Sequence, residues 1–371
     1  MNILRLAASP LIKGPLPKHG PLLEHALQNE GVNVTTITWG THRDEDGICK
    51  KICDRISDIF NIFKNLKKNK YDLMFVHTAH DWKTLIRDTT LLFFTRKLCP
   101  YVVVLFHGSA SDILSEKGKY VFKYVTSYLL NRCDAILLLS NEEMKQWQKY
   151  YPNKKFFCVN NPFVPSLPSP INKSFPWSIP EDDDVILFVG RIIPEKGIFD
   201  LIDALYLLRK SGGNVHLIAA GDGPFLAQVR SKINNLGLTS AVTLTGYVSG
   251  EDLFLIYQRA SMLVLPTYWP EGFPTVISEA MSYGLPIITT SSRGSADHLV
   301  EGVNALFVPP KNPQILCEVI QRLLTDKELR TRMAEANREK IREFSPEKVG
   351  RHYKEILQIV LNSGNNEIFR E

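Results

Sequence analysis

Two glutamates flank the start of a predicted helix. The sequence PEGFPTVISEAMSYGLP spans residues 270–286, with Glu271 ahead of the apolar segment and Glu279 inside it. Thr275 or the proline before it suits the first helical position, and Gly284 is a natural stop. The helix therefore begins between the two carboxylates, where its free N–H groups and its dipole favour an anion.

The spacing of these glutamates fits a nucleoside diphosphate. Glu279 lies just over one turn inside the helix, about 6–8 Å from the anion position at a rise of about 1.5 Å per residue. A carboxylate accepts two hydrogen bonds at once, which suits the vicinal diol of a ribose. The alternative is that Glu271 only supports the helix dipole and that Glu279 is a solvated helix residue.

A second strand–turn–helix junction supplies positive charge. The segment VILFVGRIIPEKG (185–197) presents Arg191 and Lys196 before a helix that opens at Gly197. A lysine at a helix start lies at the unfavourable end of the dipole, so an anion nearby would stabilise it. Arg191 and Lys196 together could neutralise a diphosphate without a metal ion. The alternative is a surface lysine and an ion-paired arginine.

A third junction, AAGDGPFLAQV (219–229), has Gly221 and Gly223 directly after a predicted strand. Leu226 stands where a dinucleotide fingerprint has its third glycine, so the motif is weak as an NAD site. An NAD-dependent oxidoreductase is further disfavoured because no full G-x-G-x-x-G follows the first strand. The turn does suit a backbone that lets a nucleotide approach the edge of a sheet.

The elements that position these residues are short apolar runs separated by helix-length segments. Such nearly continuous apolar runs indicate strands buried on both faces of a parallel sheet. Strand–helix alternation twice over predicts an α/β protein with two doubly wound domains. The expected strands are 3–9, 32–38, 71–77, 101–107, 135–140, 155–160, 185–190, 215–221, 242–246, 262–266, 286–290 and 305–309.

Six prolines within 161–184 mark a connector between the two domains, since proline fits neither a helix interior nor a central strand. The predicted domains are 1–165 and 166–345. The tail, 346–371, is predicted to be an amphipathic helix that returns to the first domain, with Val349, Tyr353, Ile356, Leu357 and Val360 on one side.

Charge is unevenly distributed along the chain. Residues 1–165 carry 23 Lys and Arg against 15 Asp and Glu, whereas the overall net charge is +5. The first domain is therefore the one that would face an anionic partner. The segment 50–70 predicts a basic amphipathic helix that contacts an anionic membrane; the alternative is an ordinary helix packed on the sheet with a solvated basic end.

Six scattered cysteines indicate a reducing compartment, and neither a signal peptide nor a membrane span is evident. We therefore expect a cytoplasmic protein, membrane-associated at most at the cytoplasmic face. The acidic runs at 44–46 and 181–184 are interpreted as solvated loops, so no metal site is expected. A protein that binds anionic polymers such as nucleic acid would leave the second-half motifs unexplained.

Five motifs of the second half resemble family-four retaining glycosyltransferases in order and spacing: GRIIPEKGIFDLIDAL, AAGDGP, LTGYV, PEGFPTVISEAMSYGLPII and VNALFVPPKNPQIL. The first half is similar more loosely. The resemblance implies the GT-B fold, with two Rossmann-like domains facing a cleft. It also implies a nucleotide-sugar donor, no cofactor and no metal.

The resemblance also implies roles for individual residues. Arg191 and Lys196 look like the diphosphate-binding pair, Glu279 like the ribose ligand and Glu271 like the group that holds donor-sugar hydroxyls. His107, at the end of YVVVLFH, is similar to the family histidine that lines the reaction centre; the alternative is a strand-end histidine satisfied by backbone. The other implied donor-site residues are Gly14, Gly190, Gly221, Gly223, Tyr247, Val248, Gly272, Phe273, Pro274, Thr275 and Val276.

The resemblance implies transfer of a hexosyl or N-acetylhexosaminyl group, from a UDP-sugar first or a GDP-sugar next. The acceptor would be a glycan or lipid-linked glycan in cell-surface polysaccharide or glycoconjugate synthesis. No residue stands out as a covalent nucleophile, and the resemblance favours front-face attack, with a donor phosphate oxygen taking the acceptor proton. A nucleotide-sugar epimerase or a phosphorylase of the same fold is the alternative.

Overall fold

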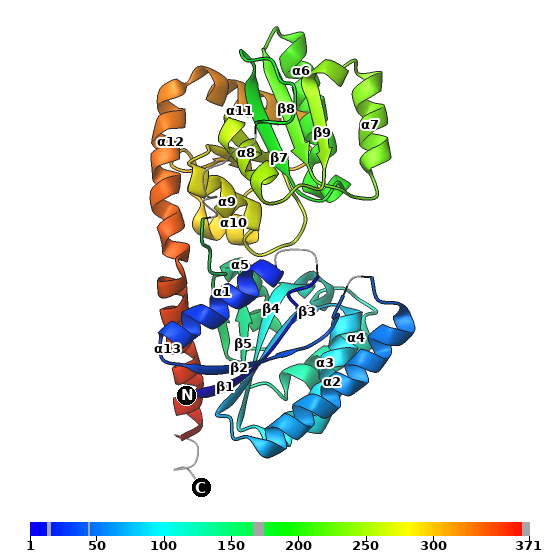
Figure 1. The fold of residues 1–371 in the computed structure, drawn as a ribbon, viewed down its shortest axis with the longest axis vertical. Coiled ribbons are helices and arrows are strands. Elements are labelled where there is room, and N and C mark those ends of the chain that lie inside the picture. The colour runs from blue at the N-terminus through cyan, green and yellow to red at the C-terminus, as the bar shows by residue number, and fades with distance from the viewer. Residues whose placement is uncertain (13–15, 44, 166–173, 366–371) are drawn as a thin grey trace. The chain divides into compact units, whose positions relative to one another are not determined.

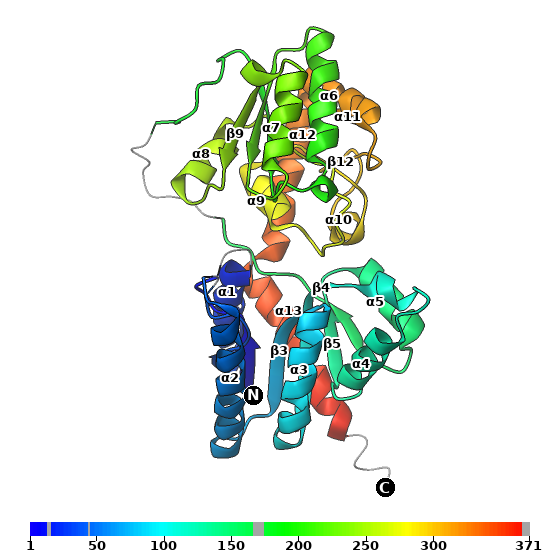
Figure 2. The ribbon, with the colours of Figure 1, turned by 90° about the vertical axis from the view of Figure 1, so that its right-hand side faces the viewer.

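The computed structural model describes residues 1–12, 16–43, 45–165 and 174–365. These residues form two parallel sheets of six strands each (Figures 1 and 2). Each of the twelve strands corresponds to one that was expected from the sequence. The chain divides into two compact units. Unit 1 comprises Met1–Val164, Pro270–Phe273 and Glu343–Glu371, and unit 2 comprises Pro165–Trp269 and Pro274–Arg342.

The sheet of unit 1 has the strand order β2-β1-β3-β4-β5-β6. Its inner strands are runs of β-branched, leucine and other apolar residues, which suit a sheet buried on both faces. The strands are β1 (Asn2–Ala7), β2 (Asn33–Thr38), β3 (Leu73–His80), β4 (Tyr101–Ser109), β5 (Ala135–Leu138) and β6 (Phe156–Cys158).

Helices cover both faces of this sheet. One core contains side chains of α2, α3, α4 and α5, and the core on the opposite face contains side chains of α1 and α13. In Figure 1, the C-terminal α13 lies beside α1. The helices are α1 (Leu16–Asn29), α2 (Ile48–Lys68), α3 (Trp82–Thr95), α4 (Tyr120–Leu130), α5 (Asn141–Tyr150) and α13 (Pro346–Asn365). All five apolar residues of the predicted α13 face are buried: Val349, Tyr353, Ile356, Leu357 and Val360.

The sheet of unit 2 has the order β12-β11-β10-β7-β8-β9. Its strands are β7 (Asp184–Val189), β8 (Val215–Ala220), β9 (Val242–Gly246), β10 (Met262–Leu265), β11 (Ile287–Thr289) and β12 (Leu306–Phe307). Its helices are α6 (Ile198–Lys210), α7 (Leu226–Asn235), α8 (Glu251–Arg259), α9 (Thr275–Tyr283), α10 (Arg293–His298), α11 (Pro313–Thr325) and α12 (Lys327–Lys340). Short 3-10 helices are η1 (Arg96–Leu98), η2 (Ser111–Leu114), η3 (Pro194–Lys196), η4 (Thr239–Ala241) and η5 (Ile341–Phe344).

One segment lies in a different unit from the one predicted. Residues 270–273 fall within the predicted second domain, but they belong to unit 1. Close packing explains this, because a Cβ added to Gly272 would lie 2.5 Å from the Leu139 Cβ, and the Phe273 ring stacks on Phe344 at 5.2 Å between centroids. Only a residue without a side chain allows such an approach.

The predicted apolar face of the 50–70 helix is not a single face. In α2, Ile62 and Leu66 are buried in the core, whereas Ile52, Ile56 and Phe60 are exposed. The exposed residues recur every four positions, so they form a stripe along the helix that differs from the face of Ile62 and Leu66. None of the described helices is both long enough and apolar enough to cross a bilayer.

Candidate functional site

The strand order of unit 2 reverses at β7. The chain moves from β7 through β8 to β9 on one side and then places β10 on the other side of β7. In open α/β sheets, ligands bind outside the carboxyl ends of the strands at such a switch point. The two segments that leave this point are 190–197, after β7, and 266–274, after β10. The first segment and residues 270–274 of the second were singled out from the sequence.

The carbonyl of Glu195 connects these two segments. It accepts hydrogen bonds from the backbone N–H groups of Tyr268 at 2.8 Å and Trp269 at 3.1 Å, and from the Thr267 hydroxyl at 3.1 Å. A carbonyl that serves three donors fixes the backbone of η3 against the segment after β10. The side chain of the next residue, Lys196, is thereby held at the switch point.

Lys196 is only 8% exposed, so the alternative of a surface lysine is wrong. Its side chain lies along the turn, because a Cβ added to Gly190 would be 4.0 Å from the Lys196 Cδ. The next residue, Gly197, has φ 78°, and a Cβ there would lie 2.3 Å from the Pro266 carbonyl oxygen. Glycine is therefore required at 197 both for the left-handed backbone and for the close approach.

Arg191 is exposed, and its guanidinium lies over the Trp269 ring, 4.8 Å from the centroid. Among the described residues its guanidinium contacts this ring, and no ion pair there supports the alternative of an ion-paired arginine. Stacking on an aromatic face leaves the N–H groups of the guanidinium edge free to donate to oxygens. The stacking partner, Trp269, was not expected from the sequence.

Gly221 and Gly223 hold the turn after β8 against the turn after β7. A Cβ at Gly221 would lie 1.8 Å from the Gly190 carbonyl oxygen, and one at Gly223 would lie 2.5 Å from the Ile192 carbonyl oxygen. The Ile192 N–H also donates to the Asp222 carbonyl at 3.0 Å. This packing alone accounts for both glycines, and their contact with a nucleotide stays a prediction.

The helix between the two glutamates begins and ends as predicted. Helix α9 starts at Thr275, the preceding residue Pro274 supplies no side-chain cap, and Gly284 ends the helix with φ 69°. The first N–H groups of the helix, including those of Thr275 and Val276, have no intrahelical acceptor and carry the positive end of the dipole. This N-terminus comes after β10, which pairs with β7, the strand that Arg191 and Lys196 follow.

Glu279 has a defined partner in α8. The buried Tyr257 hydroxyl donates a 2.8 Å hydrogen bond to the Glu279 Oε2. Burial, and next the Glu279 charge, raise the pKa of Tyr257 well above its usual range, so the phenol remains a donor. Glu279 is thus held by a buried side chain and is not simply a solvated helix residue. Tyr257 was missed from the sequence, since a tyrosine at an apolar helix position gives no sign of its partner.

The remaining predicted donor-site residues have different surroundings. Tyr247 is 64% exposed and Val248 is half-buried, directly after β9. Glu271 lies in unit 1 with Gly272 and Phe273, whereas Pro274 lies in unit 2. Gly14 lies outside the described residues.

His107 lies near the end of β4 and lines a cavity of about 300 Å³ in unit 1. Its Nε2 is 3.0 Å from the His77 Nδ1, and the Arg5 Nε donates to the His77 Nε2 at 3.1 Å. The alternative of a histidine satisfied by backbone is therefore wrong. Other polar side chains that line the cavity are His19, Glu24, Thr36, Thr78 and Arg87.

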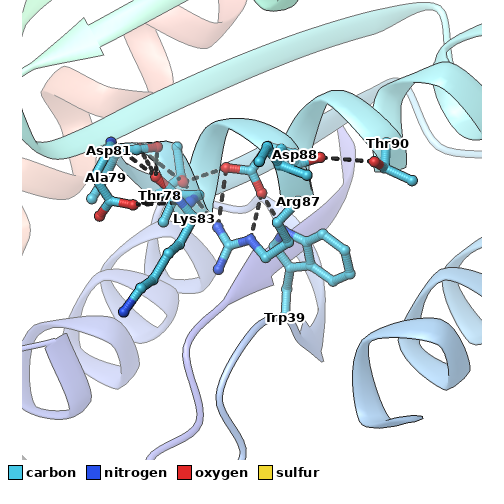
Figure 3. A network of polar contacts seen from close by, with 10 residues as sticks. Trp39, Thr78, Ala79, Asp81, Lys83, Arg87, Asp88 and Thr90 are labelled. Carbon is cyan, nitrogen blue, oxygen red and sulfur yellow. Dashed lines mark hydrogen bonds and ion pairs between the residues drawn. The ribbon is translucent and has the colours of Figure 1, made fainter. Parts of the chain in front are cut away.

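A second polar network fixes one wall of this cavity. Figure 3 shows the buried Asp88 carboxylate accepting from the Trp39 indole at 2.7 Å, from the Arg87 Nε at 2.7 Å and from the Thr78 hydroxyl. Three donors on one carboxylate compensate for its desolvation. The network joins α3 to the end of β3 and to the residue after β2. It thereby fixes the strand that carries His77.

The described ranges contain no group of three or more His, Cys, Asp or Glu side chains that could hold a metal ion. The absence of a metal requirement stays a prediction.

Residues 171–340 match the family model described as Glycosyl transferases group 1. The region 171–340 therefore belongs to this family. An uncharacterized glycosyltransferase of Methanocaldococcus jannaschii is 32% identical over 253 residues, 67% of this chain and 65% of the relative. A capsular polysaccharide biosynthesis glycosyltransferase, CapM of Staphylococcus aureus, is 32% identical over 165 residues, 43% of this chain and 42% of the relative. The matched region therefore spans less than two thirds of the length of each of these two relatives.

Among solved structures, HepE of Anabaena in complex with UDP and glucose superposes with a TM-score of 0.70 at 20% identity. The match covers 96% of this chain and 99% of HepE. This likeness and the two doubly wound units show that the chain has the GT-B fold expected from the sequence.

Proposed function

We propose that the protein is a retaining glycosyltransferase that moves a hexosyl or N-acetylhexosaminyl group from a nucleotide diphosphate sugar to a glycan or lipid-linked glycan. Membership of the group 1 family and the polysaccharide-forming relative support the reaction class. The observation that carries the proposal is the switch point of unit 2. There, Arg191 and Lys196 follow β7, the strand paired with β10, and the segment after β10 leads to the N-terminus of α9.

Each donor group has a distinct task in this proposal. Lys196, held by the backbone of η3, and Arg191, stacked on Trp269, bind the diphosphate oxygens together with the N–H groups of α9. Glu279, oriented by Tyr257, accepts from the ribose hydroxyls. A UDP-sugar is favoured because HepE, which has the same fold, binds UDP and glucose, and a GDP-sugar is next.

The charge that develops during transfer explains why cations are needed. When the glycosidic C–O bond breaks, negative charge grows on the leaving diphosphate, and fixed donors stabilise it without reorganising. The family resemblance favours front-face attack, in which the donor phosphate oxygen takes the proton of the acceptor hydroxyl. Arg191 and Lys196 can supply the charge compensation that a metal ion supplies elsewhere.

The acceptor is proposed to bind unit 1, whose cavity is lined by His107. We further propose that unit 1 contacts an anionic membrane. Residues 48–132 carry 15 Lys and Arg against 7 Asp and Glu. In Figure 2, α2, α3 and α4 lie on the same unit, and α3 packs against both neighbours. Their exposed large apolar side chains are Ile48, Ile52, Ile56 and Phe60 on α2, Trp82, Ile86, Phe93 and Phe94 on α3, and Tyr120, Val121 and Tyr124 on α4.

Apolar side chains surrounded by lysines are typical of a surface that inserts shallowly into anionic lipid. Phe60 is 69% exposed and Tyr124 is 72% exposed, which is costly in water and favourable at a lipid interface. This proposal places the lipid-linked acceptor and the cation-rich unit at the same surface.

The reaction is tested by release of UDP or GDP from a panel of nucleotide sugars, with purified full-length protein and EDTA present. Release from one donor, stimulated by a lipid-linked glycan acceptor, supports the proposal. Interconversion of the donor sugar without an acceptor would indicate the epimerase instead. Release that needs inorganic phosphate would indicate the phosphorylase. No turnover, together with no binding of UDP or GDP, would overturn the nucleotide-sugar assignment.

The membrane contact is tested by flotation of the full-length chain with vesicles of anionic or zwitterionic phospholipid. We expect flotation with anionic vesicles only, and its loss in the Phe60→Ser variant. Ile359→Ser is the matched control, because Ile359 is an exposed apolar residue of α13. Equal loss in both variants, or no flotation of the parent protein, would contradict the proposed contact.

A further inference from the structure

Three side chains from adjacent strands form a hydrogen-bonded chain in unit 1. Arg5 lies on β1, His77 on β3 and His107 on β4, and these strands are neighbours in the sheet. The Arg5 Nε lies 3.1 Å from the His77 Nε2, and the His77 Nδ1 lies 3.0 Å from the His107 Nε2. Arg5 and His77 are buried at 2% and 8% exposure, so these hydrogen bonds lie largely away from bulk solvent.

The direction of this chain follows from the chemistry of its first member. A guanidinium can only donate, so the His77 Nε2 must be the unprotonated nitrogen of its ring. The proton of a neutral His77 is then on Nδ1, which donates to the His107 Nε2. That nitrogen must in turn be unprotonated. The proton of a neutral His107 is therefore on Nδ1.

Both rings are neutral near pH 7. Burial, the Arg5 charge and then His107 hold the pKa of His77 well below its usual range. Burial, His19 and Arg5 lower the pKa of His107 to about 3. Arg5 retains a carboxylate, since its Nη1 lies 3.2 Å from the Glu24 Oε2. The positive end of the chain is therefore Arg5, and both imidazoles act as relays.

We propose that Arg5 and His77 are positioning residues that hold His107 as the neutral Nδ1–H tautomer. His107 then offers a hydrogen-bond donor, not a base, to an oxygen of the substrate bound in the cavity. The class of ligand group is a hydroxyl or a phosphate oxygen, which can accept. The substrate's identity rests on the proposed function; the tautomer rests only on Arg5 and His77.

This assignment bears on where the acceptor proton goes. A histidine whose Nε2 already accepts from His77 and whose Nδ1 carries a proton cannot remove a proton from the attacking hydroxyl. The base must then be another group, in agreement with the donor phosphate oxygen of the front-face route. The histidine contributes orientation of the bound sugar.

The direct test is the tautomer itself. In the full-length chain labelled with ¹⁵N-histidine, long-range ¹H–¹⁵N correlation spectra distinguish Nδ1–H from Nε2–H rings, and the His77→Asn and His107→Asn variants assign the signals. We expect both rings to be neutral Nδ1–H tautomers at pH 7.5 and at pH 5.5. A His107 ring that is Nε2–H, or doubly protonated at pH 7.5, would overturn the proposal. This outcome is read without turnover, so it is independent of the proposed reaction.

A pair of variants separates positioning from structural support. In His77→Asn, the side-chain amide can still donate to the His107 Nε2, whereas His77→Leu cannot. We expect His77→Leu to lower kcat about tenfold with little change in the donor KM, and to give a mixture of His107 tautomers. His77→Asn should restore most of the kcat and the Nδ1–H signal. Equal losses of kcat in both variants, with the His107 tautomer unchanged, would overturn the positioning role.

Discussion

The two units share a topology but differ in the polar groups at the switch point. In unit 1 the strand order reverses at β1, and in unit 2 it reverses at β7. Unit 1 places Arg5, His77 and His107 there in a buried chain that ends in neutral imidazoles. Unit 2 places Arg191 in an exposed position and Lys196 in a buried one, both directly after the strand at which the order reverses.

This difference indicates different ligands. A neutral donor such as an imidazole N–H discriminates the position of a hydroxyl without attracting charge. Two cationic side chains and a helix N-terminus attract a multiply charged anion such as a diphosphate. The proposed function accordingly assigns a glycan to the first edge and a nucleotide diphosphate to the second.

The largest effect is expected when a cationic side chain is removed from the switch point of unit 2, where Arg191 and Lys196 form the cationic edge. Lys196→Ala should lower kcat about 10²- to 10³-fold, because a fixed donor to the developing charge of the leaving group is lost. Arg230→Ala, an exposed arginine of α7, is the charge-matched control and should keep the parental kcat. Steady-state kinetics with the active donor measures both. A Lys196→Ala enzyme with near-parental kcat would show that the charge at this edge does not serve the reaction.

The next effect tests how rigidly unit 2 holds this lysine. Gly197→Ala should lower the free energy of unfolding by about 3 kcal/mol or more, because the left-handed backbone and the Pro266 carbonyl both oppose a Cβ. Gly212→Ala shares the positive φ, 86°, but meets no atom within 4 Å, so it should cost only about 1 kcal/mol. Urea unfolding of the two variants measures the difference. Equal costs would mean that the contact with Pro266 is unimportant.

Acid should affect unit 1 before unit 2. Burial lowers the pKa of His77, His80 and His107 in unit 1, whereas in unit 2 His216 alone is shown with a lowered pKa among the described residues. The unfolded chain binds protons below about pH 6.5 while these folded rings do not, so stability falls as pH decreases from there toward 3. Each such ring can cost up to about 1.4 kcal/mol per pH unit.

Hydrogen exchange between pH 7 and pH 5, corrected for intrinsic rates, measures this prediction. Amides of β3 and β4 should lose protection before those of β7 and β8. Earlier loss in unit 2 would contradict the assignment of the buried neutral histidines as the acid-sensitive groups.

The smallest effect is expected at Tyr257, whose hydroxyl orients the proposed ribose ligand Glu279. Tyr257→Phe should raise the donor KM about three- to tenfold and leave kcat nearly unchanged, since it removes one hydrogen bond that orients Glu279. Tyr206→Phe in α6 is the matched control. An unchanged KM in both variants would show that Tyr257 only supports the helix.

The strands and the cationic edge of unit 2 were predictable because their signals are local. Most strands are single short apolar runs. Arg191 and Lys196 follow one such run in the motif 185–197, and Thr275 opens a helix in the motif 270–286. The relay of unit 1 was not predictable, since its contacts join residues 72 and 30 positions apart. No periodicity in a sequence reports which side chains of neighbouring strands face each other.

Two further features required the fold. The segment 270–273 belongs to unit 1 because Gly272 packs on Leu139, a contact between residues far apart in the chain. The α2 helix was expected to present one apolar face, but α3 and the sheet bury only part of it and leave Phe60 outside. Amphipathicity alone does not show how much of a face its neighbours cover.

The central claim, that the switch point of unit 2 binds a nucleoside diphosphate through Arg191 and Lys196, is tested most directly by calorimetric titration of UDP and GDP into the full-length protein with EDTA present. We predict binding of one of them, UDP first, with loss in Lys196→Ala and none in Arg230→Ala. Binding that is equal in all three proteins, or no binding of either nucleotide by the parent chain, would contradict the claim.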